Sequence, residues 1–251
     1  MYTANMTPEE IERETNAEMD NIRAKLAYKI KEFRRKVLKA TKFPVSMIYE
    51  QRTVRKNRWV ITMTADSKKN IDEKAALKCY CISESPLGKF VYKPILHKSE
   101  EIYSGRKLKF ETVVFKPHFF SRYRERMGIE ETGDKLIIKL MGKLNNVLTK
   151  MERRDDGSWA SIQIFEDGFC LGDVIAMDKV HLTRTFVPKR MLFSDQLPDM
   201  QYYEEDAEIL NAAKNHEICP DYFDDETKEL FDLLNKLNDS LEDLYNQLNY
   251  A

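Results

Sequence analysis

The residues best suited to chemistry lie in one short segment near the middle of the chain. His118, Arg122 and Arg126 follow one another at intervals of four residues, which places them on one stripe of a helix. Arginine binds phosphate oxygens in a bidentate manner, and histidine exchanges a proton near neutral pH. The stripe therefore suits phosphodiester cleavage, in which the histidine moves a proton and the arginines stabilise charge on the phosphorus oxygens. Two alternatives stay open, namely nucleic-acid contact without catalysis and an ion-paired structural surface.

The pattern around this stripe predicts the elements that position it. Pro117 suits the first turn of a helix over residues 118–127, and apolar residues at helical spacing predict a second helix over 134–153. Strands are expected over 159–165, 169–177 and 180–187, with a tight turn at Asp167 and Gly168. Residues 116–187 thus read as two helices followed by an antiparallel meander.

Residues 113–190 resemble a group of small bacterial domains of unknown function whose helix reads His-Ala-x-x-Arg-Met-x-x-Arg-Gly-Ile. His118, Arg122 and Arg126 match that pattern, whereas Met127 displaces its glycine. The group is similar to ribonucleases of the RelE, barnase and colicin type, so the resemblance implies a ribonuclease-like unit over 116–190.

The resemblance also implies which residues act. His118, Arg122 and Arg126 would be catalytic, together with residues of the last strand. Alternation along that strand predicts that His181, Thr183 and Thr185 share one face and that Arg184 lies on the other. The full expected set is His118, Arg122, Arg126, His181 and Thr185 for catalysis, and Lys116, Arg124 and Arg184 for nucleic-acid binding.

The rest of the chain predicts an α+β fold, in which helices pack on an antiparallel sheet. A long N-terminal helix is expected over 8–41, and strands over 58–65, 78–83, 89–96 and 108–115. Trp59 and Trp159 lie in strand patterns and are expected in the core. The expected organisation is an N-terminal helix (1–43), an α+β core (44–194) and an acidic helical C-terminal region (195–251).

Charge is divided unevenly along the chain. Residues 1–130 carry 28 Lys and Arg against 17 Asp and Glu, a net charge of +11, whereas residues 195–251 carry 3 against 16, a net charge of −13. This division indicates that the basic residues 1–130 bind RNA or another polyanion. Alternatively, the acidic region contacts the basic one, mimics nucleic acid and restrains activity. Simple solvation of each charged surface is the other explanation.

Leucines at heptad spacing over residues 227–250 predict a helix that pairs within the molecule, with a second copy or with a protein partner. No run of about 20 apolar residues is present, so no membrane span is expected. The four cysteines are consistent with reduced thiols, so a cytoplasmic protein is expected. If a phage encodes the protein, its expected location is the host cytoplasm or the virion.

No metal or other cofactor is expected, because Cys79 and Cys81 lack a second ligand pair and no nucleotide-binding motif occurs. Two functions therefore remain. The first is a nucleic-acid-interacting protein that acts as a metal-independent endoribonuclease. The alternative is a non-enzymatic assembly or phage accessory protein whose terminal helices dock a partner.

Overall fold

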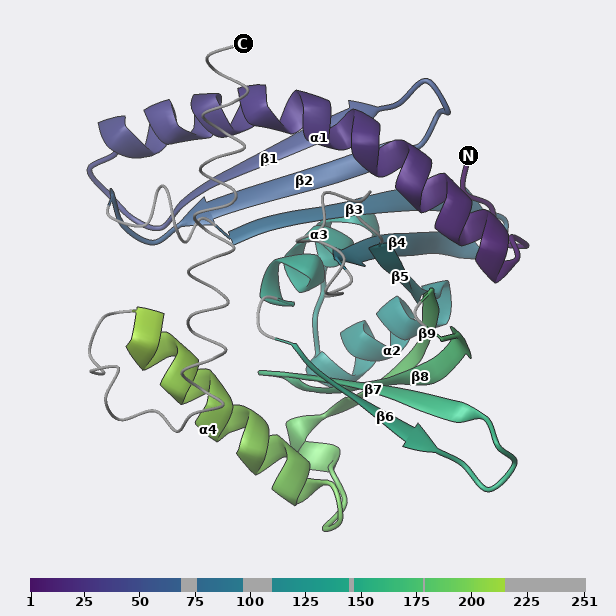
Figure 1. Ribbon diagram of the computed structural model, residues 1–251. Coiled ribbons are helices and arrows are strands. Elements are labelled where there is room, and N and C mark those ends of the chain that lie inside the picture. The colour runs from purple at the N-terminus through teal and green to yellow at the C-terminus, as the bar shows by residue number, and fades with distance from the viewer. Residues whose placement is uncertain (69–75, 97–109, 145–146, 178, 215–251) are drawn as a thin grey trace, which may run out of the picture. The chain divides into compact units, whose positions relative to one another are not determined.

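A computed structural model describes residues 1–68, 76–96, 110–144, 147–177 and 179–214 (Figure 1). Its helices are α1 (Pro8–Lys39), α2 (Pro117–Met127), α3 (Gly133–Lys143), α4 (Leu197–Lys214) and the short 3-10 helix η3 (Lys189–Met191). Its strands are β1 (Val45–Arg52), β2 (Arg58–Ala65), β3 (Ala76–Ser85), β4 (Gly88–Leu96), β5 (Phe110–Phe115), β6 (Leu148–Arg153), β7 (Trp159–Phe165), β8 (Gly168–Ala176) and β9 (Val180–Pro188).

The strands form one sheet in the order β1-β2-β3-β4-β5-β9-β8-β7-β6. Neighbouring strands pair antiparallel except β5 and β9, which run parallel with Val113 opposite His181. This parallel pair joins two antiparallel meanders into a continuous sheet. The predicted α+β class is confirmed, and the sheet is mostly rather than wholly antiparallel.

Helix α1 begins with a capping box and ends two residues before the predicted position. The amide of Glu10 donates to the hydroxyl of Thr7, and the amide of Thr7 donates to the carboxylate of Glu10 at 2.8 Å. Both bonds satisfy amides that have no partner within the helix. Pro8 occupies the first turn, where its missing N–H is not needed.

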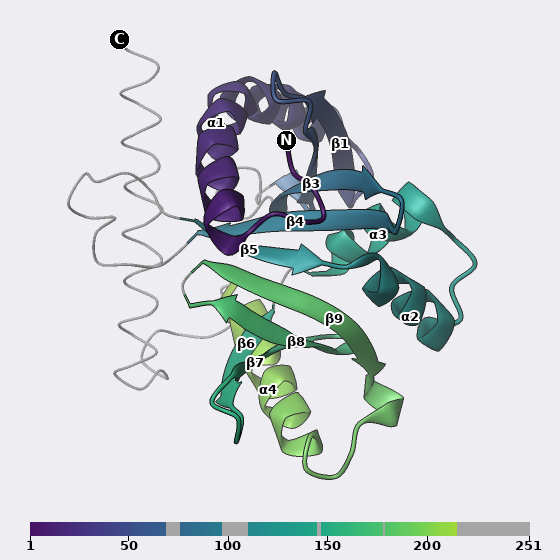
Figure 2. The ribbon, with the colours of Figure 1, turned by 90° about the vertical axis from the view of Figure 1, so that its right-hand side faces the viewer.

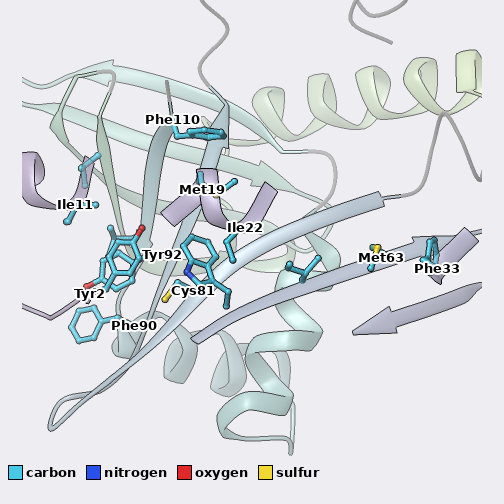
Figure 3. Close-up of a cluster of buried hydrophobic side chains, with 14 of the residues drawn as sticks. Tyr2, Ile11, Met19, Ile22, Phe33, Met63, Cys81, Phe90, Tyr92 and Phe110 are labelled. Carbon is cyan, nitrogen blue, oxygen red and sulfur yellow. The ribbon is translucent and has the colours of Figure 1, made fainter. Parts of the chain in front are cut away.

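Helix α1 covers one face of the sheet and buries its apolar stripe there (Figure 3). The ring of Tyr2 stacks on Tyr92 of β4, with centroids 4.3 Å apart, next to the fully buried Trp59 of β2. The helix contributes Ile11, Met19, Ile22, Phe33 and Val37 to this core. The N-terminal helix is therefore part of the same hydrophobic core as strands β1–β5.

Helices α2 and α3 lie on the opposite face of the sheet from α1 (Figure 2). Alternation along β5 produces this division, because Val114 joins the α1 core while the next residue, Phe115, contacts Phe119 of α2. The central strands are thus buried on both faces. This explains why β2, with its run of apolar residues, shows little polar alternation.

The predicted helix over 134–153 is wrong in its second half. Helix α3 ends at Lys143, and residues 148–153 form strand β6, in which Met151 pairs with Ser161 of β7. The longer helix was predicted because Leu148 and Met151 continue the helical spacing of the apolar residues in α3. Pairing with β7 overrides that pattern and leaves Met151 45% exposed at the sheet edge.

The sequence pattern missed β1, which forms the other edge of the sheet. Residues 45–52 pair with β2 along their full length, and Ile48 is exposed. Trp159 also differs from expectation, because it lies 37% exposed whereas Trp59 is buried. Both errors concern strands near sheet edges, where apolar residues face water on one side.

The chain divides into two compact units, residues 1–203 and 204–251. In the first unit, the start of α4 is held to β6 by an ion pair between Lys150 and Asp199, 2.8 Å long. The predicted leucine heptads over 227–250 lie outside the described residues, as does the acidic region from residue 215 onward. None of the described helices is both long and apolar enough to cross a membrane.

Candidate nucleic-acid interface

Helix α2 confirms the helix predicted over residues 118–127, and aromatic packing anchors it to the sheet. Pro117 opens it, and Gly128 closes it in the left-handed conformation with φ 65°. Its buried side is aromatic, since Phe119 packs on Phe115, and Tyr123 packs edge-on against Phe186 of β9 with centroids 4.8 Å apart. The opposite side of α2 is therefore held rigidly toward solvent.

A polar contact beneath α2 ties it to the neighbouring elements. The hydroxyl of Tyr123 donates to Asp167, at the β7–β8 turn, at 2.5 Å, and the ammonium of Lys143 lies 2.9 Å from the same carboxylate. Burial, followed by the hydrogen bond to Asp167, raises the pKa of Tyr123 far above its ordinary value. Tyr123 therefore stays protonated and serves as a donor that fixes the position of α2.

The exposed side carries the predicted stripe. The Nε of Arg122 donates to Nε2 of His118 at 3.2 Å, and its Nη1 lies 3.2 Å from the carboxylate of Glu125. Arg122 thus connects a histidine acceptor and a carboxylate on the surface. His118 is exposed, and its ring lies beside a guanidinium that Glu125 also holds.

Arg126, the third member of the stripe, is used by the fold. Its guanidinium donates to the backbone carbonyl of Phe186, and its own carbonyl accepts a hydrogen bond from Arg190. These bonds join the end of α2 to β9 and to η3. Arg126 therefore positions α2, while Arg190 adds an exposed cation that was not predicted from the sequence. The only sequence signal was the Lys-Arg pair directly after the last strand.

His181 is separated from the stripe by its burial in the sheet. It is 4% exposed, its Nδ1 lies 2.9 Å from the hydroxyl of Ser161, and its Nε2 lies 3.6 Å from the carboxylate of Glu111. A serine, a histidine and a carboxylate thus form a line across β7, β9 and β5. These contacts give the three residues the geometry of a satisfied core network.

A β-bulge changes which residues of β9 share a face. Gly172 pairs with Thr183 and Leu171 pairs with Thr185, so Arg184 is an extra residue without a counterpart in β8. Because Leu171 and Gly172 point to opposite faces, Thr183 and Thr185 do as well. The prediction that His181, Thr183 and Thr185 share one face is therefore wrong for Thr185. Local alternation cannot reveal an inserted residue.

The three predicted nucleic-acid contacts have different surroundings. Arg184 is exposed but ion-pairs with Asp173 of β8. Lys116 is the N-cap residue of α2 and is partly buried. Arg124 is exposed, and within the described residues it pairs with no carboxylate. Of the three, Arg124 is the cation best placed to bind an external anion.

The arginines of α2 flank its exposed side. Successive helical residues turn by about 100°, so Arg122 and Arg124 leave the helix on opposite flanks with Ser121 between them. Residues 116–126 carry four basic residues against the single acid Glu125. We refer to Lys116, Arg122, Arg124 and Arg190 as the basic face.

Two surface hollows lie near these elements. One, of about 470 Å³, is lined by the polar residues Glu50, Gln51, Arg52, Arg58 and Asp134. The other, of about 300 Å³, lies between α2, α3 and the β3–β4 turn. His118, Arg122 and His181 line neither hollow. Among the described residues no group of His, Cys, Asp and Glu is arranged to hold a metal ion, and Cys81 and Cys170 are buried free thiols.

Comparison of the chain with protein-family models, curated proteins and solved structures gave no match. The function must therefore be inferred from the basic face and its surroundings.

Proposed function

We propose that the basic face binds the phosphate backbone of RNA. The observation that carries the proposal is a pair of arginines, the half-buried Arg122 and the exposed Arg124, on the two flanks of a helix whose other side is fixed by aromatic packing. Guanidinium groups bind phosphate oxygens in a bidentate manner, and a rigid support lowers the entropy lost on binding. A strand lying across α2 would meet a cation on either side of Ser121.

Charge substitutions on α2 test this proposal. Arg122→Ala and Arg124→Ala each remove one phosphate contact, so each should weaken binding of a labelled single-stranded RNA about tenfold at low salt. The double variant should also flatten the slope of log affinity against log salt by about 1.4, since each phosphate contact on a single strand contributes about 0.7. Glu125→Gln removes the negative charge between the arginines and should tighten binding.

Arg153→Ala provides the matched control, because Arg153 is an exposed arginine of β6 that lies away from α2. Fluorescence anisotropy measures all five variants against the unaltered chain. If Arg153→Ala weakens binding as much as Arg122→Ala and Arg124→Ala do, RNA binds through general charge attraction and the basic face has no special role.

RNA cleavage is a second candidate, favoured by the hydrogen bond from Arg122 to His118. In this reaction the ribose 2′-oxygen forms a bond to the adjacent phosphorus, and the bond from phosphorus to the 5′-oxygen breaks. His118 accepts the 2′-hydroxyl proton and returns it to the departing oxygen, while Arg122 stabilises the phosphorane oxygens. The products are a 2′,3′-cyclic phosphate and a free 5′-hydroxyl, and no metal is needed.

Incubation of labelled RNA in EDTA tests cleavage separately from binding. His118→Asn should lower the cleavage rate by about a hundredfold or more while leaving RNA affinity within a factor of a few. DNA of the same sequence, which lacks the 2′-hydroxyl, should remain intact. A chain that binds RNA but never cleaves it would exclude the catalytic candidate and leave backbone binding as the function.

A further inference from the structure

The hollow between α2, α3 and the β3–β4 turn lies directly beside the basic face. Its apolar wall includes Phe120 of α2 and Leu136 and Ile137 of α3, all buried in the fold behind it. Its rim carries Ser121 and Arg124. A small apolar recess with cationic and hydroxyl groups at its edge suits a flat ring that bears polar edges and is attached to an anion.

Arg124 joins this hollow to the phosphate-binding surface. It lines the hollow and also belongs to the basic face, with Ser121 between it and Arg122. A phosphate bound by Arg124 would therefore hold its own nucleotide at the mouth of the hollow. The volume of about 300 Å³ is at the lower end of small-molecule pockets, which favours one ring system over a larger ligand.

Hydroxyl groups are available at the rim for the edge of such a ring. Thr132 is the N-cap residue of α3, but its side chain makes no capping hydrogen bond. Among the described residues, the hydroxyl of Ser121 makes one long hydrogen bond, of 3.4 Å, to the carbonyl of Pro117. Both groups can exchange roles as donor and acceptor, so they can bond the polar edge of a base without strict sequence preference.

We infer that this hollow receives one unpaired nucleobase of the RNA strand whose phosphates lie on Arg122 and Arg124. The inference rests on the proposed binding of RNA by the basic face, and it specifies that the ligand is single-stranded. A base held in a duplex cannot enter the hollow, because its edge is paired and its faces are stacked. The basic face alone would bind only the phosphates of the strand, and the hollow adds a contact with one base.

Two ligands of equal charge test the inference. One is a short single-stranded RNA of uridines, and the other is the same sugar–phosphate backbone without bases. The unaltered chain should bind the uridine strand about tenfold more tightly, as expected when one base is buried against aromatic and apolar groups. Both ligands should show the same dependence on salt, because they make the same phosphate contacts.

Filling the hollow should abolish this preference. Ser121 is exposed at the rim, so Ser121→Phe can place a ring over the hollow without disturbing the packed side of α2. This variant should bind both ligands with the affinity that the unaltered chain has for the abasic strand. Ser158→Phe, which adds the same ring at an exposed serine between β6 and β7 outside the hollow, should leave the preference unchanged, and circular dichroism checks that both variants are folded.

The outcomes separate this inference from the proposed function. Equal binding of both ligands by the unaltered chain would show that no base enters the hollow, and backbone binding would stand. A preference that survives Ser121→Phe would place the base elsewhere and overturn the inference. Failure to bind either strand would contradict RNA binding by the basic face and remove the inference with it.

Discussion

Trp59→Phe is expected to lower the free energy of unfolding by about 3 kcal/mol, because it leaves a buried carboxylate without its donor. Trp59 is fully buried beneath α1, and its indole N–H donates to Glu18 at 2.8 Å. Glu18 is itself fully buried, and its second carboxylate oxygen has no hydrogen-bond partner among the described residues. The Nε of Arg55 lies 3.9 Å from that second oxygen.

A double variant separates the hydrogen bond from the loss of ring volume. Trp59→Phe combined with Glu18→Leu removes donor and acceptor together, so it should recover most of the stability lost in Trp59→Phe. Urea unfolding followed by circular dichroism measures each variant. Trp159→Phe is the matched control, since Trp159 is 37% exposed and should change stability by less than about 0.5 kcal/mol. A double variant no more stable than Trp59→Phe would contradict the explanation.

Lys93→Met is expected to raise the free energy of unfolding by on the order of 2 kcal/mol at pH 7. Lys93 lies on β4, and its ammonium reaches the carbonyl of Leu144, just after α3, over 3.4 Å. Burial lowers the pKa of Lys93 from 10.5 to about 8, so the charged form is disfavoured in the folded protein. Methionine fills similar space and carries no charge that must lose its water.

The effect should depend on pH in a defined direction. Below pH 8 the lysine is charged in both states, and the folded protein bears the full penalty of holding the charge. Between the folded pKa of about 8 and the unfolded value of 10.5, the unfolded state binds more protons, so the stability of the unaltered chain rises with pH. The advantage of Lys93→Met should therefore shrink as the pH increases from 7 to 9.5.

Urea unfolding at pH 7 and pH 9.5 measures this difference. Lys135→Met is the matched control, because Lys135 is an exposed lysine of α3 and its loss should leave the pH dependence unchanged. A destabilised Lys93→Met variant would show that Lys93 stabilises the fold through its bond to Leu144. An advantage that is equal at both pH values would show that the charge of Lys93 is not its cause.

The sequence determined those elements whose signals are local. Pro8 with the acidic first turn marks the start of α1, and Pro117 with Gly128 brackets α2. Tight-turn residues marked most of the meander β7–β9 in the same way. The stripe of His118 and Arg122 was also predictable, because side chains four residues apart on a helix are neighbours whatever the rest of the chain does.

Only the tertiary structure decided features that depend on a distant partner. Residues 148–153 became a strand through pairing with β7, although their spacing favoured a helix. The β-bulge at Arg184 places Thr185 on the opposite face of the sheet from Thr183. The guanidinium of Arg126 donates to the carbonyl of Phe186, so Arg126 has a structural role.

The same dependence governs the buried polar groups and the hollow. Glu111 meets His181 because β5 and β9 pair in parallel, and Ser161 meets His181 because β7 and β9 both pair with β8. The hollow beside Arg124 exists because α3 packs next to α2. Sequence periodicity describes one element at a time, whereas register between strands and packing between helices join residues that lie far apart in the chain.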